Sequence, residues 1–362
     1  MKNLCFIDFN ISAVGGIERV LTSLCNELCK DYNVHIVSIT GDYKKCIYNI
    51  NKNIKCFNIG CNSNERVRNI ILKSFGCLKD YISKNNIDIV FMIGHYVPPI
   101  ALPVKPFVKS KFVFCDHGAL INQLDDKKAI LFRKLGSKLS DKTIVLTERT
   151  MNDYQNILNI KKEKIDYIYN WLDDDIIKNS VDYNIDSNKI LSCGRFGQEK
   201  GYDILIDVAK IVFERHPSWE WHIYGNGEKL EDVKNMIYNN NLQNNVMLMG
   251  VSNNMYDIYK DYSIFALTSY REGLPLVLLE AKANRLPIIS FDCATGPSEI
   301  IQDNLDGYLI ECYNKDEMAN KICNMIEDRE LRKRFSDNSI KNLDKFSKEI
   351  ICKKWNNLIR SL

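Results

Sequence analysis

The 362-residue sequence has no apolar run long enough to cross a membrane. Its longest apolar stretches, such as "IDIVFMIG" at 87–94, fall far short of the roughly 20 residues that a transmembrane helix needs. The opening residues, "MKNLCFIDFN", are typical of a strand followed by a loop, and they lack the apolar core and cleavage site of a signal peptide. These absences favour a cytoplasmic protein.

Spacings typical of metal sites and disulfides are also missing. The 13 cysteines are odd in number and form no CxxC pair, and only five histidines are present. This pattern indicates the reduced thiols of a cytoplasmic protein. The acidic run Asp173–Asp175 lacks a second acidic group at ligand spacing, so we interpret it as a solvated turn. We expect no metal and no other cofactor.

The net charge of +3 conceals an uneven distribution. Counted from Lys, Arg, Asp and Glu, residues 1–170 carry +9 and residues 171–362 carry −6. Because single cores rarely grow beyond roughly 250–300 residues, two domains are expected, and their opposite charges suggest different partners. The basic half suits an anionic surface. Nucleic acid is disfavoured, because the basic segments lack the interleaved aromatic side chains of single-strand binders.

Both halves alternate short apolar strands with amphipathic helices. Strands are predicted at 3–9, 33–40, 87–94, 111–117 and 142–147, and again at 189–196, 219–225, 245–250, 262–269, 286–292 and 307–311. Such alternation predicts a parallel sheet with helices on both faces, and it occurs twice. The predicted fold class is therefore α/β, with two Rossmann-like doubly wound domains facing a central cleft.

The domain limits follow from the same pattern. We expect an N-terminal domain over 1–170, a C-terminal domain over 171–345 and a final helix within 346–362. The polar, weakly periodic stretch at 169–184 is the expected linker. In doubly wound sheets ligands bind beyond the carboxyl ends of the strands, so functional side chains are expected just after strands.

Two such positions suit a phosphate group. Gly15 and Gly16 precede a predicted helix, where the backbone can approach an anion and the helix N-terminus favours negative charge. They do not form a GxGxxG fingerprint, and a plain tight turn is the alternative. Arg195 and Lys200 flank a glycine-containing loop after a strand, and their charges suit a diphosphate. The alternative is a pair of solvated cations.

Two of the five histidines follow predicted strands directly. His95 lies in "IGHYVPP" and His117 in "FCDHGAL", where Gly118 follows it. His117 is the stronger candidate for a functional residue. The alternative is an ordinary histidine that is satisfied by its neighbours.

A carboxylate stands on an apolar helical face in "REGLPLVLLEAKANRLPIIS". A helix is predicted from Pro275, which suits a first helical position, to Asn284. Its period places Glu280 on the same face as Leu276 and Leu279, with no cation one turn away. A buried carboxylate without a partner is costly, so Glu280 requires a hydrogen-bond donor that the sequence does not reveal.

Basic and apolar residues alternate in two segments of the first half. Such helices can lie on anionic headgroups, and a solvated helix face is the alternative. The residues proposed for this surface are Arg66, Arg68, Lys73, Lys127, Lys128, Arg133, Lys134 and Lys138.

Five segments together resemble the retaining nucleotide-sugar glycosyltransferases of family GT4, which have the GT-B fold. They are "GGIERV", "GRFGQEKGYDILI", "GVSNNMYDIYKDYSIFALTS", "SYREGLPLVLLEAKANRLPIIS" with its Glu-x7-Glu spacing, and "TGPSEIIQDNLDGYLIE". The resemblance extends over nearly the whole chain and is strongest over 190–310. It departs from many relatives at Ala294, where they carry proline.

The resemblance implies a role for each matching residue. Glu272 would contact the donor sugar, Glu280 the ribose, and His117 the reacting sugar, whereas Arg195 and Lys200 would stabilise the departing diphosphate. The implied donor site is formed by Gly15, Gly16, Arg195, Lys200, Val251, Glu272, Gly273, Leu274, Pro275 and Glu280, with Val251 near the base. The expected reaction is metal-independent glycosyl transfer with retention.

"SFDCATGPSEII" resembles enzymes that use UDP-hexoses or UDP-N-acetylhexosamines to build bacterial surface polysaccharides such as O-antigen and capsule. The implied acceptor is a polyprenyl-diphosphate-linked glycan at the cytoplasmic face of the inner membrane, with His95 and the basic helices on the acceptor side. Three alternatives stay open: a GDP-sugar-dependent transferase, a UDP-sugar epimerase and a non-catalytic nucleotide-sugar-binding protein.

Overall fold

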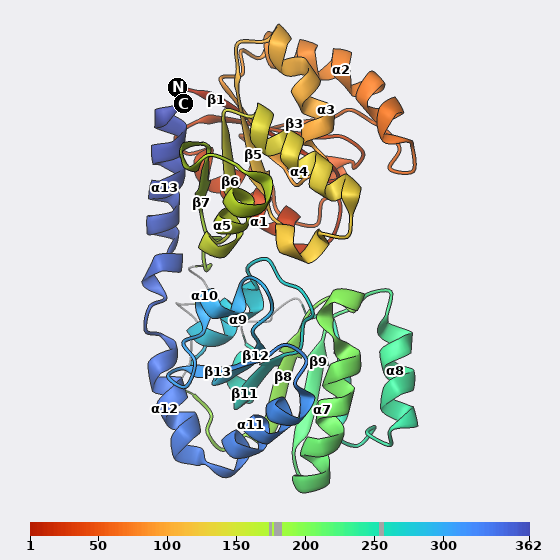
Figure 1. Cartoon of the computed structure of the whole chain (residues 1–362), viewed down its shortest axis with the longest axis vertical. Helices are drawn as coiled ribbons and strands as arrows, with labels where there is room; N and C mark the ends of the chain where they lie inside the picture. Colours follow the sequence, from red (N-terminus) through yellow and green to blue (C-terminus); the bar gives the residue numbers. More distant parts are fainter. Residues whose placement is uncertain (174–175, 177–182, 253–256) are drawn as a thin grey trace. The chain divides into compact units, whose positions relative to one another are not determined.

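The computed structural model describes residues 1–173, 176, 183–252 and 257–362. The chain divides into two compact units (Figure 1): the N-terminal unit comprises residues 1–170 and 351–362, and the C-terminal unit comprises residues 171–350. Half of the predicted linker at 169–184, namely 174–175 and 177–182, lies outside the described residues. Among the described residues, no helix is both long and apolar enough to cross a membrane.

The N-terminal unit is built on a seven-stranded parallel sheet of order β3-β2-β1-β4-β5-β6-β7. Its strands are β1 (Asn3–Asp8), β2 (Asn33–Ser38), β3 (Lys55–Asn58), β4 (Ile89–Ile93), β5 (Lys111–Asp116), β6 (Lys142–Val145) and β7 (Ile165–Tyr167). Every residue of β4 is buried, as expected for a strand covered on both faces. The strand order changes direction at β1 and β4, where ligands bind in such sheets.

Helices cover both faces of this sheet. They are α1 (Gly16–Leu28), α2 (Val67–Lys84), α3 (Pro98–Ala101), α4 (Lys127–Leu139), α5 (Glu148–Leu158) and α13 (Lys348–Ser361). Side-chain caps begin two of them, since Asp126 accepts from two backbone N–H groups of α4 and Thr147 accepts from one of α5. The last helix lies beside the N-terminus (Figure 1), and Trp355 meets Phe91 with ring centroids 5.8 Å apart.

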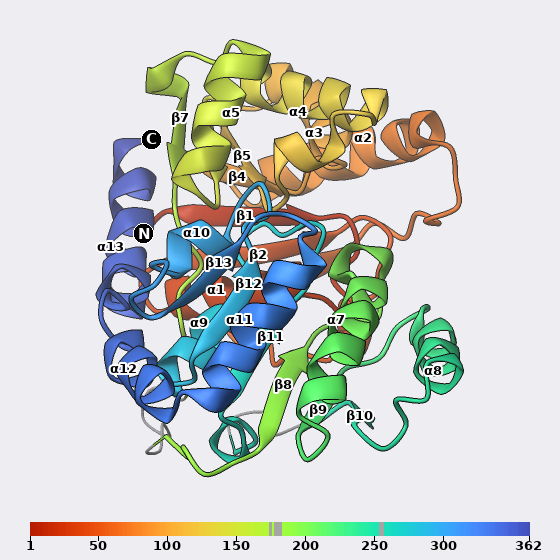
Figure 2. The ribbon, with the colours of Figure 1, turned by 60° about the horizontal axis from the view of Figure 1, so that its bottom comes forward.

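The C-terminal unit holds a six-stranded parallel sheet of order β10-β9-β8-β11-β12-β13. Its strands are β8 (Lys189–Cys193), β9 (Glu220–Tyr224), β10 (Val246–Gly250), β11 (Ile264–Leu267), β12 (Ile288–Phe291) and β13 (Gly307–Ile310). Its helices are α7 (Tyr202–Arg215), α8 (Leu230–Asn239), α9 (Leu276–Ala283), α10 (Pro297–Ile300), α11 (Lys315–Glu327) and α12 (Arg329–Ser339). Figure 2 shows α7 and α11 side by side on one face of this sheet, over a core that includes Trp221 and Phe291.

The predicted α/β class with two parallel sheets is confirmed. Two strands escaped prediction, β3 and β7, because both are short and neither is fully buried. Between β10 and β11 the described residues include a 3₁₀ turn, η6 (Tyr259–Asp261). The helix predicted over 275–284 spans Leu276–Ala283, and Pro275 is its N-cap rather than its first residue.

Candidate active site

A buried ion pair lies in the loops of the C-terminal unit that follow β8 and β11. Lys200 Nζ donates to Glu272 Oε1 at 2.7 Å, and Ser269 Oγ donates to the same oxygen at 2.7 Å. Burial disfavours the charged ammonium, but the adjacent Glu272 carboxylate outweighs it, so the pKa of Lys200 is raised above its usual value. Lys200 therefore keeps its positive charge beside Glu272 in a site that is largely shielded from water.

Backbone geometry brings these loops together. Gly201, directly after Lys200, has a φ of +62°, and a Cβ there would lie 2.2 Å from the carbonyl oxygen of Thr268. Only glycine allows this approach without strain. Thr295 Oγ1 donates to the backbone oxygen of Glu272 at 2.6 Å, which ties in the loop after β12. Lys200 and Glu272 are thus held by three loops at one edge of the sheet.

Arg195, expected beside Lys200, is paired elsewhere within the unit. Its Nη2 donates to Glu228 Oε2 at 2.9 Å, and its side chain is 62% exposed. Exposed pairs of this kind contribute little to stability, so exchanging Glu228 for an anionic ligand has a small cost. Arg195 can therefore bind a phosphate, although the structure does not join it to Lys200.

Glu280 is buried as the helical period predicted, but it does have a partner. The Tyr259 hydroxyl donates to Glu280 Oε2 at 2.9 Å, and Tyr259 is fully buried in η6. The sequence did not reveal this donor, which the chain itself supplies. A tyrosine 21 residues away gives no periodic signal, and only the packing of η6 against α9 makes the contact.

The remaining donor-site residues of the C-terminal unit differ in exposure. Leu274 is buried, whereas Val251, after β10, is 69% exposed. The Gly273–Pro275 turn packs on Gly296, whose φ is +99° and where a Cβ would lie 2.7 Å from the Gly273 oxygen. That glycine therefore sets how closely the loop after β12 approaches the Glu272 loop.

Gly15 and Gly16 form the N-terminus of α1, as predicted, but the Glu18 carboxylate lies beside Gly15 and interacts electrostatically with Asp8. A Cβ on Gly15 would lie 2.7 Å from Glu18 Oε2. Burial raises the pKa of Glu18, and burial together with the Glu18 charge raises the pKa of Asp8, the last residue of β1, to about 7. Sequence reasoning missed this acidic pair, and it opposes the simple picture of an anion cradle.

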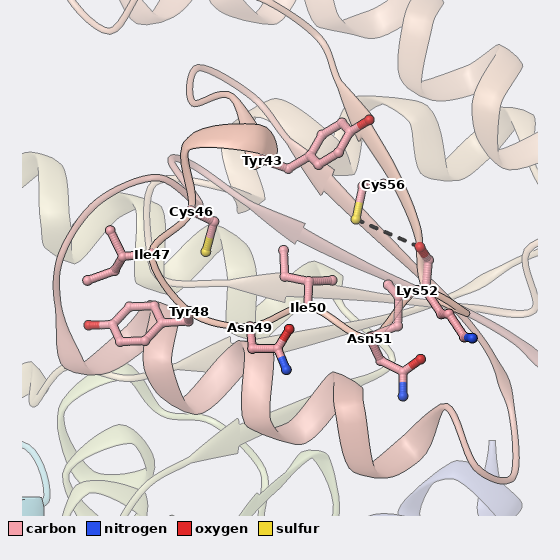
Figure 3. A pocket seen from close by; sticks show the side chains of 10 residues that line it. Tyr43, Cys46, Ile47, Tyr48, Asn49, Ile50, Asn51, Lys52 and Cys56 are labelled. Carbon is pink, nitrogen blue, oxygen red and sulfur yellow. Dashed lines mark hydrogen bonds between the residues drawn. The ribbon is translucent and has the colours of Figure 1, made fainter. Parts of the chain in front are cut away.

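The same turn borders the pocket drawn in Figure 3. This pocket of about 480 Å³ lies in the N-terminal unit, and its lining residues are Tyr43, Cys46, Ile47, Tyr48, Asn49, Ile50, Asn51, Lys52, Ile54 and Cys56. Tyr48 donates its hydroxyl to the Gly15 backbone oxygen at 3.0 Å. None of the predicted site residues lines the pocket.

His95 and His117 follow β4 and β5, two neighbouring strands. Burial lowers the pKa of His117 to about 4, so its imidazole is neutral near pH 7. The pKa of His95 is lowered by burial and then by the charge of Arg133. Among the described residues, Nε2 of His95 has no hydrogen-bond partner although it is buried. A neutral imidazole can exchange hydrogen bonds with a sugar hydroxyl.

Arg133 does not belong to the predicted surface. It is fully buried, and its Nε donates to Asp116 Oδ2 at 2.7 Å. The period of α4 places it on the inward face with Ala129, Gly136 and Ser137. The prediction that Arg133 faces a membrane was wrong, because a charged residue was assumed to be exposed.

The other basic candidates are exposed, and large apolar side chains accompany them. The exposed cations are Arg66, Arg68, Lys73, Lys127, Lys128, Lys134 and Lys138, and the exposed apolar residues nearby in the chain are Leu72, Phe107, Leu131 and Leu139. Lys73 pairs with Glu65 at 2.7 Å. Helix α4 itself contains no acidic residue.

No group of three potential metal ligands gathers within the part of the chain that the structure describes. Asp174 and Asp175 of the acidic run lie outside that part.

Two family models match adjacent parts of the chain. The model described as Glycosyltransferase Family 4 matches residues 14–176, and that described as Glycosyl transferases group 1 matches residues 173–342. An uncharacterized glycosyltransferase of Haemophilus influenzae is 27% identical, over 99% of this chain and 100% of that protein. The amylovoran biosynthesis glycosyltransferase AmsD of Erwinia amylovora is 28% identical over 99% of both.

Solved structures share the fold over the full length. A complex of Staphylococcus aureus TarM with UDP and saccharides has a TM-score of 0.82 at 20% identity and 99% coverage of both chains. Anabaena HepE with UDP and glucose has a TM-score of 0.83 at 16% identity and full coverage of both. Because the two family models together span residues 14–342, the chain belongs to the GT4 glycosyltransferases, which have the GT-B fold.

Proposed function

We propose that this glycosyltransferase moves a hexose or N-acetylhexosamine from a UDP-sugar to a lipid-linked saccharide during bacterial surface polysaccharide biosynthesis. The observation that carries the proposal is the buried Lys200–Glu272 pair, since it combines a cation for a diphosphate with a carboxylate for sugar hydroxyls. AmsD, named for amylovoran biosynthesis, and HepE, solved with UDP and glucose, support the pathway class and the nucleotide.

In this proposal the residues of the C-terminal unit hold the donor. Glu280 accepts from the ribose hydroxyls, and the backbone around Val251 touches the base. Lys200 and Arg195 bind the diphosphate, and Glu272 with the Gly273–Pro275 turn binds the sugar. Tyr259 already orients the Glu280 carboxylate, so less freedom is lost when the ribose binds.

The reaction breaks the bond between the anomeric carbon and the diphosphate oxygen. The acceptor hydroxyl attacks the same face, and its proton passes to the departing phosphate oxygen, which gives retention. Negative charge develops on that diphosphate, so fixed cations provide the main electrostatic stabilisation. Gly15 and Gly16 with the N-terminus of α1 approach the diphosphate, and neutral His117 binds a hydroxyl of the reacting sugar. His95 lies on the acceptor side.

Nucleotide preference is tested first, by thermal shift with UDP, GDP, ADP and uridine. A ligand that binds only the folded state at one hundred times its dissociation constant adds about 2.7 kcal/mol of stability. We expect UDP to raise the melting temperature, Glu280→Gln to remove the shift, and exposed Glu214→Gln to retain it. A shift with GDP alone would replace the donor by a GDP-sugar, and no shift with any nucleotide would contradict the donor site.

The reaction products distinguish a transferase from an epimerase. Incubation with UDP-glucose or UDP-N-acetylglucosamine and extracted polyprenyl-diphosphate glycans should release UDP in step with glycan growth. A changed sugar that stays linked to UDP would instead indicate an epimerase. Glu272→Gln should abolish release while the protein stays folded, and full activity in that variant would refute the role of Glu272.

Membrane binding is proposed for the exposed cations of α4 with Arg66 and Arg68 of the α2 region. Each basic residue near an anionic surface contributes about 1 kcal/mol, and Leu131 offers an exposed apolar side chain on α4. Sedimentation with vesicles of phosphatidylglycerol and phosphatidylethanolamine should weaken by about tenfold or more in Lys134→Gln/Lys138→Gln.

The matched control is Lys161→Gln/Lys162→Gln, which removes the same charge from exposed positions outside α2 and α4. Equal loss in both double variants would mean that net charge alone drives binding. Unchanged sedimentation in both would contradict peripheral attachment through α4.

A further inference from the structure

A fully buried ion pair lies directly beside His117. Asp116 is the last residue of β5, and Arg133 approaches it from α4 with both side chains shielded from solvent. Replacing such a pair by apolar side chains is often neutral or stabilising, because desolvation offsets the attraction between the charges. Stability is therefore a weak reason for burying these charges here, and their geometry indicates another role.

The pair ties down the backbone on both sides of His117. Asp116 Oδ1 accepts from the N–H of Gly118 at 3.1 Å, and Asp116 Oδ2 accepts from the Tyr154 hydroxyl at 2.6 Å. Arg133 Nη2 donates to Gln123 Oε1, at the end of the 3₁₀ turn η3 (Leu120–Gln123). One hydrogen-bond network therefore anchors the turn that carries His117 at three points: at Asp116 before the histidine, at Gly118 after it, and at Gln123 at the end of η3.

Gly118 allows the close approach. A Cβ at this position would lie 2.9 Å from Arg133 Nη2, so any larger residue would push the guanidinium away. The glycine that follows His117 in the sequence therefore has a structural reason: it leaves room for the Arg133 side chain to pack against the turn.

The network also sets the charge around His117. The Asp116 carboxylate favours a protonated imidazole, whereas burial opposes it and prevails, with the pKa of His117 at about 4. Arg133 compensates Asp116 from the other side. The remaining titratable groups of this cluster are Tyr154 on α5, His95 after β4, and Asp126 at the start of α4.

We infer that Arg133, acting through Asp116 and with Tyr154, is a positioning residue that holds His117 in place as a neutral hydrogen-bonding group. This inference rests on the proposed function, in which His117 contacts the reacting sugar. Arg133 itself touches no substrate in this account, and its effect passes through the backbone of the turn and the charge of Asp116.

The first test needs no substrate. Histidine proton resonances of the full chain are titrated by NMR, with His117 assigned by its absence in His117→Ala. In Arg133→Met the uncompensated Asp116 should raise the His117 titration midpoint, whereas Lys134→Met on the exposed face of α4 should leave it unchanged. A midpoint that is the same in both variants would overturn the inference.

The second test is a double-mutant cycle on UDP release from UDP-glucose and UDP-N-acetylglucosamine, with water as acceptor. Arg133→Met/Asp116→Leu avoids leaving a lone buried charge, and Tyr154→Phe removes only one hydroxyl. We expect the double variant to lose about 100-fold in kcat with its UDP thermal shift unchanged. Combination with His117→Ala should add little further loss.

The outcomes separate the two proposals. Fully additive losses, or wild-type kcat in the double variant, would show that the network does not act through His117. If UDP does not raise the melting temperature of the wild-type protein, the proposed donor is refuted. The NMR titration of His117 would still decide whether Arg133 positions this histidine. Arg133→Lys keeps a cation beside Asp116 but lacks the forked guanidinium group. Partial recovery of kcat in this variant, relative to Arg133→Met, would show that the charge contributes separately from the hydrogen bond to Gln123.

Discussion

Asp8 should make the N-terminal unit less stable as the pH rises. Its side chain is 4% exposed, and burial with the nearby Glu18 charge raises its pKa from 3.8 to about 7. A carboxyl with a raised pKa binds its proton more tightly in the folded than in the unfolded state. The contribution of Asp8 to the free energy of unfolding is therefore fully present below about pH 4 and is lost as the pH rises to about 7.

The magnitude follows from the pKa difference. A pKa difference of about 3 between the folded and unfolded states corresponds to about 4 kcal/mol of unfolding free energy, at about 1.36 kcal/mol per pKa unit. In Asp8→Asn the side chain stays neutral at every pH, and its carbonyl oxygen can still accept from the Asn10 N–H that Asp8 Oδ2 binds at 2.8 Å. The variant should therefore gain stability over the wild type progressively between pH 4 and pH 8.

Buried histidines, among them His35 and His117, act in the opposite direction and must be subtracted. Burial lowers the pKa of both His35 and His117 to about 4, so each binds a proton more tightly in the unfolded state. Their contribution to stability rises with pH between about 4 and 6.5. Because both residues are present in wild type and variant, the difference between the two proteins isolates Asp8.

Urea unfolding between pH 4 and pH 8 measures this difference, with hydrogen-exchange mass spectrometry of β1 peptides to assign the transition to the N-terminal unit. Glu18→Gln should give a smaller effect of the same sign, since it removes only the second cause of the raised pKa. Exposed Asp31→Asn is the control. A stability difference that stays flat from pH 4 to pH 8 would refute the reasoning.

Three substitutions test packing. Lys282→Met should cost about 3–5 kcal/mol, because it leaves Asp306 charged and unpaired in the core; a smaller loss by urea unfolding would contradict a true ion pair. Gly136→Ala should cost about 1–3 kcal/mol although alanine favours helices, because a Cβ there would lie 2.8 Å from the Phe114 ring; increased thermal stability would contradict this. Gly201→Ala should lower stability and UDP affinity together, and separate effects would argue against its role in placing the Lys200 loop.

The sequence was informative where a local period decides the outcome. The alternation of strands and helices predicted both sheets, and the position of Glu280 on an apolar face predicted its burial correctly. Its partner Tyr259 could not be predicted, because that hydrogen bond joins two elements that meet only in the folded unit. The Asp8–Glu18 pair was missed for the same reason.

Arg133 shows the opposite error, since the evidence was present in the sequence. Ala129, Arg133 and Gly136 recur at helical spacing, and small residues on one face indicate close packing against a neighbour. Assigning Arg133 to the surface together with Lys127, Lys128, Lys134 and Lys138 ignored that stripe. A charged residue inside a stripe of small residues is better interpreted as a buried group that requires a counter-ion, and Asp116 provides one.

The two carboxylates of the Glu-x7-Glu motif are stabilised by different means. Glu272 is paired with the Lys200 ammonium, whereas Glu280 accepts from the neutral hydroxyl of Tyr259. A diphosphate that binds Lys200 competes with Glu272 for the same cation, so Glu272 then needs other donors, and sugar hydroxyls beside the Ser269 hydroxyl can supply them. Glu280 does not have to exchange its partner in this way, because the neutral Tyr259 hydroxyl does not attract the anionic diphosphate. In the proposed donor complex, diphosphate and sugar recognition are therefore coupled through Lys200 and Glu272, and ribose recognition by Glu280 is independent of both.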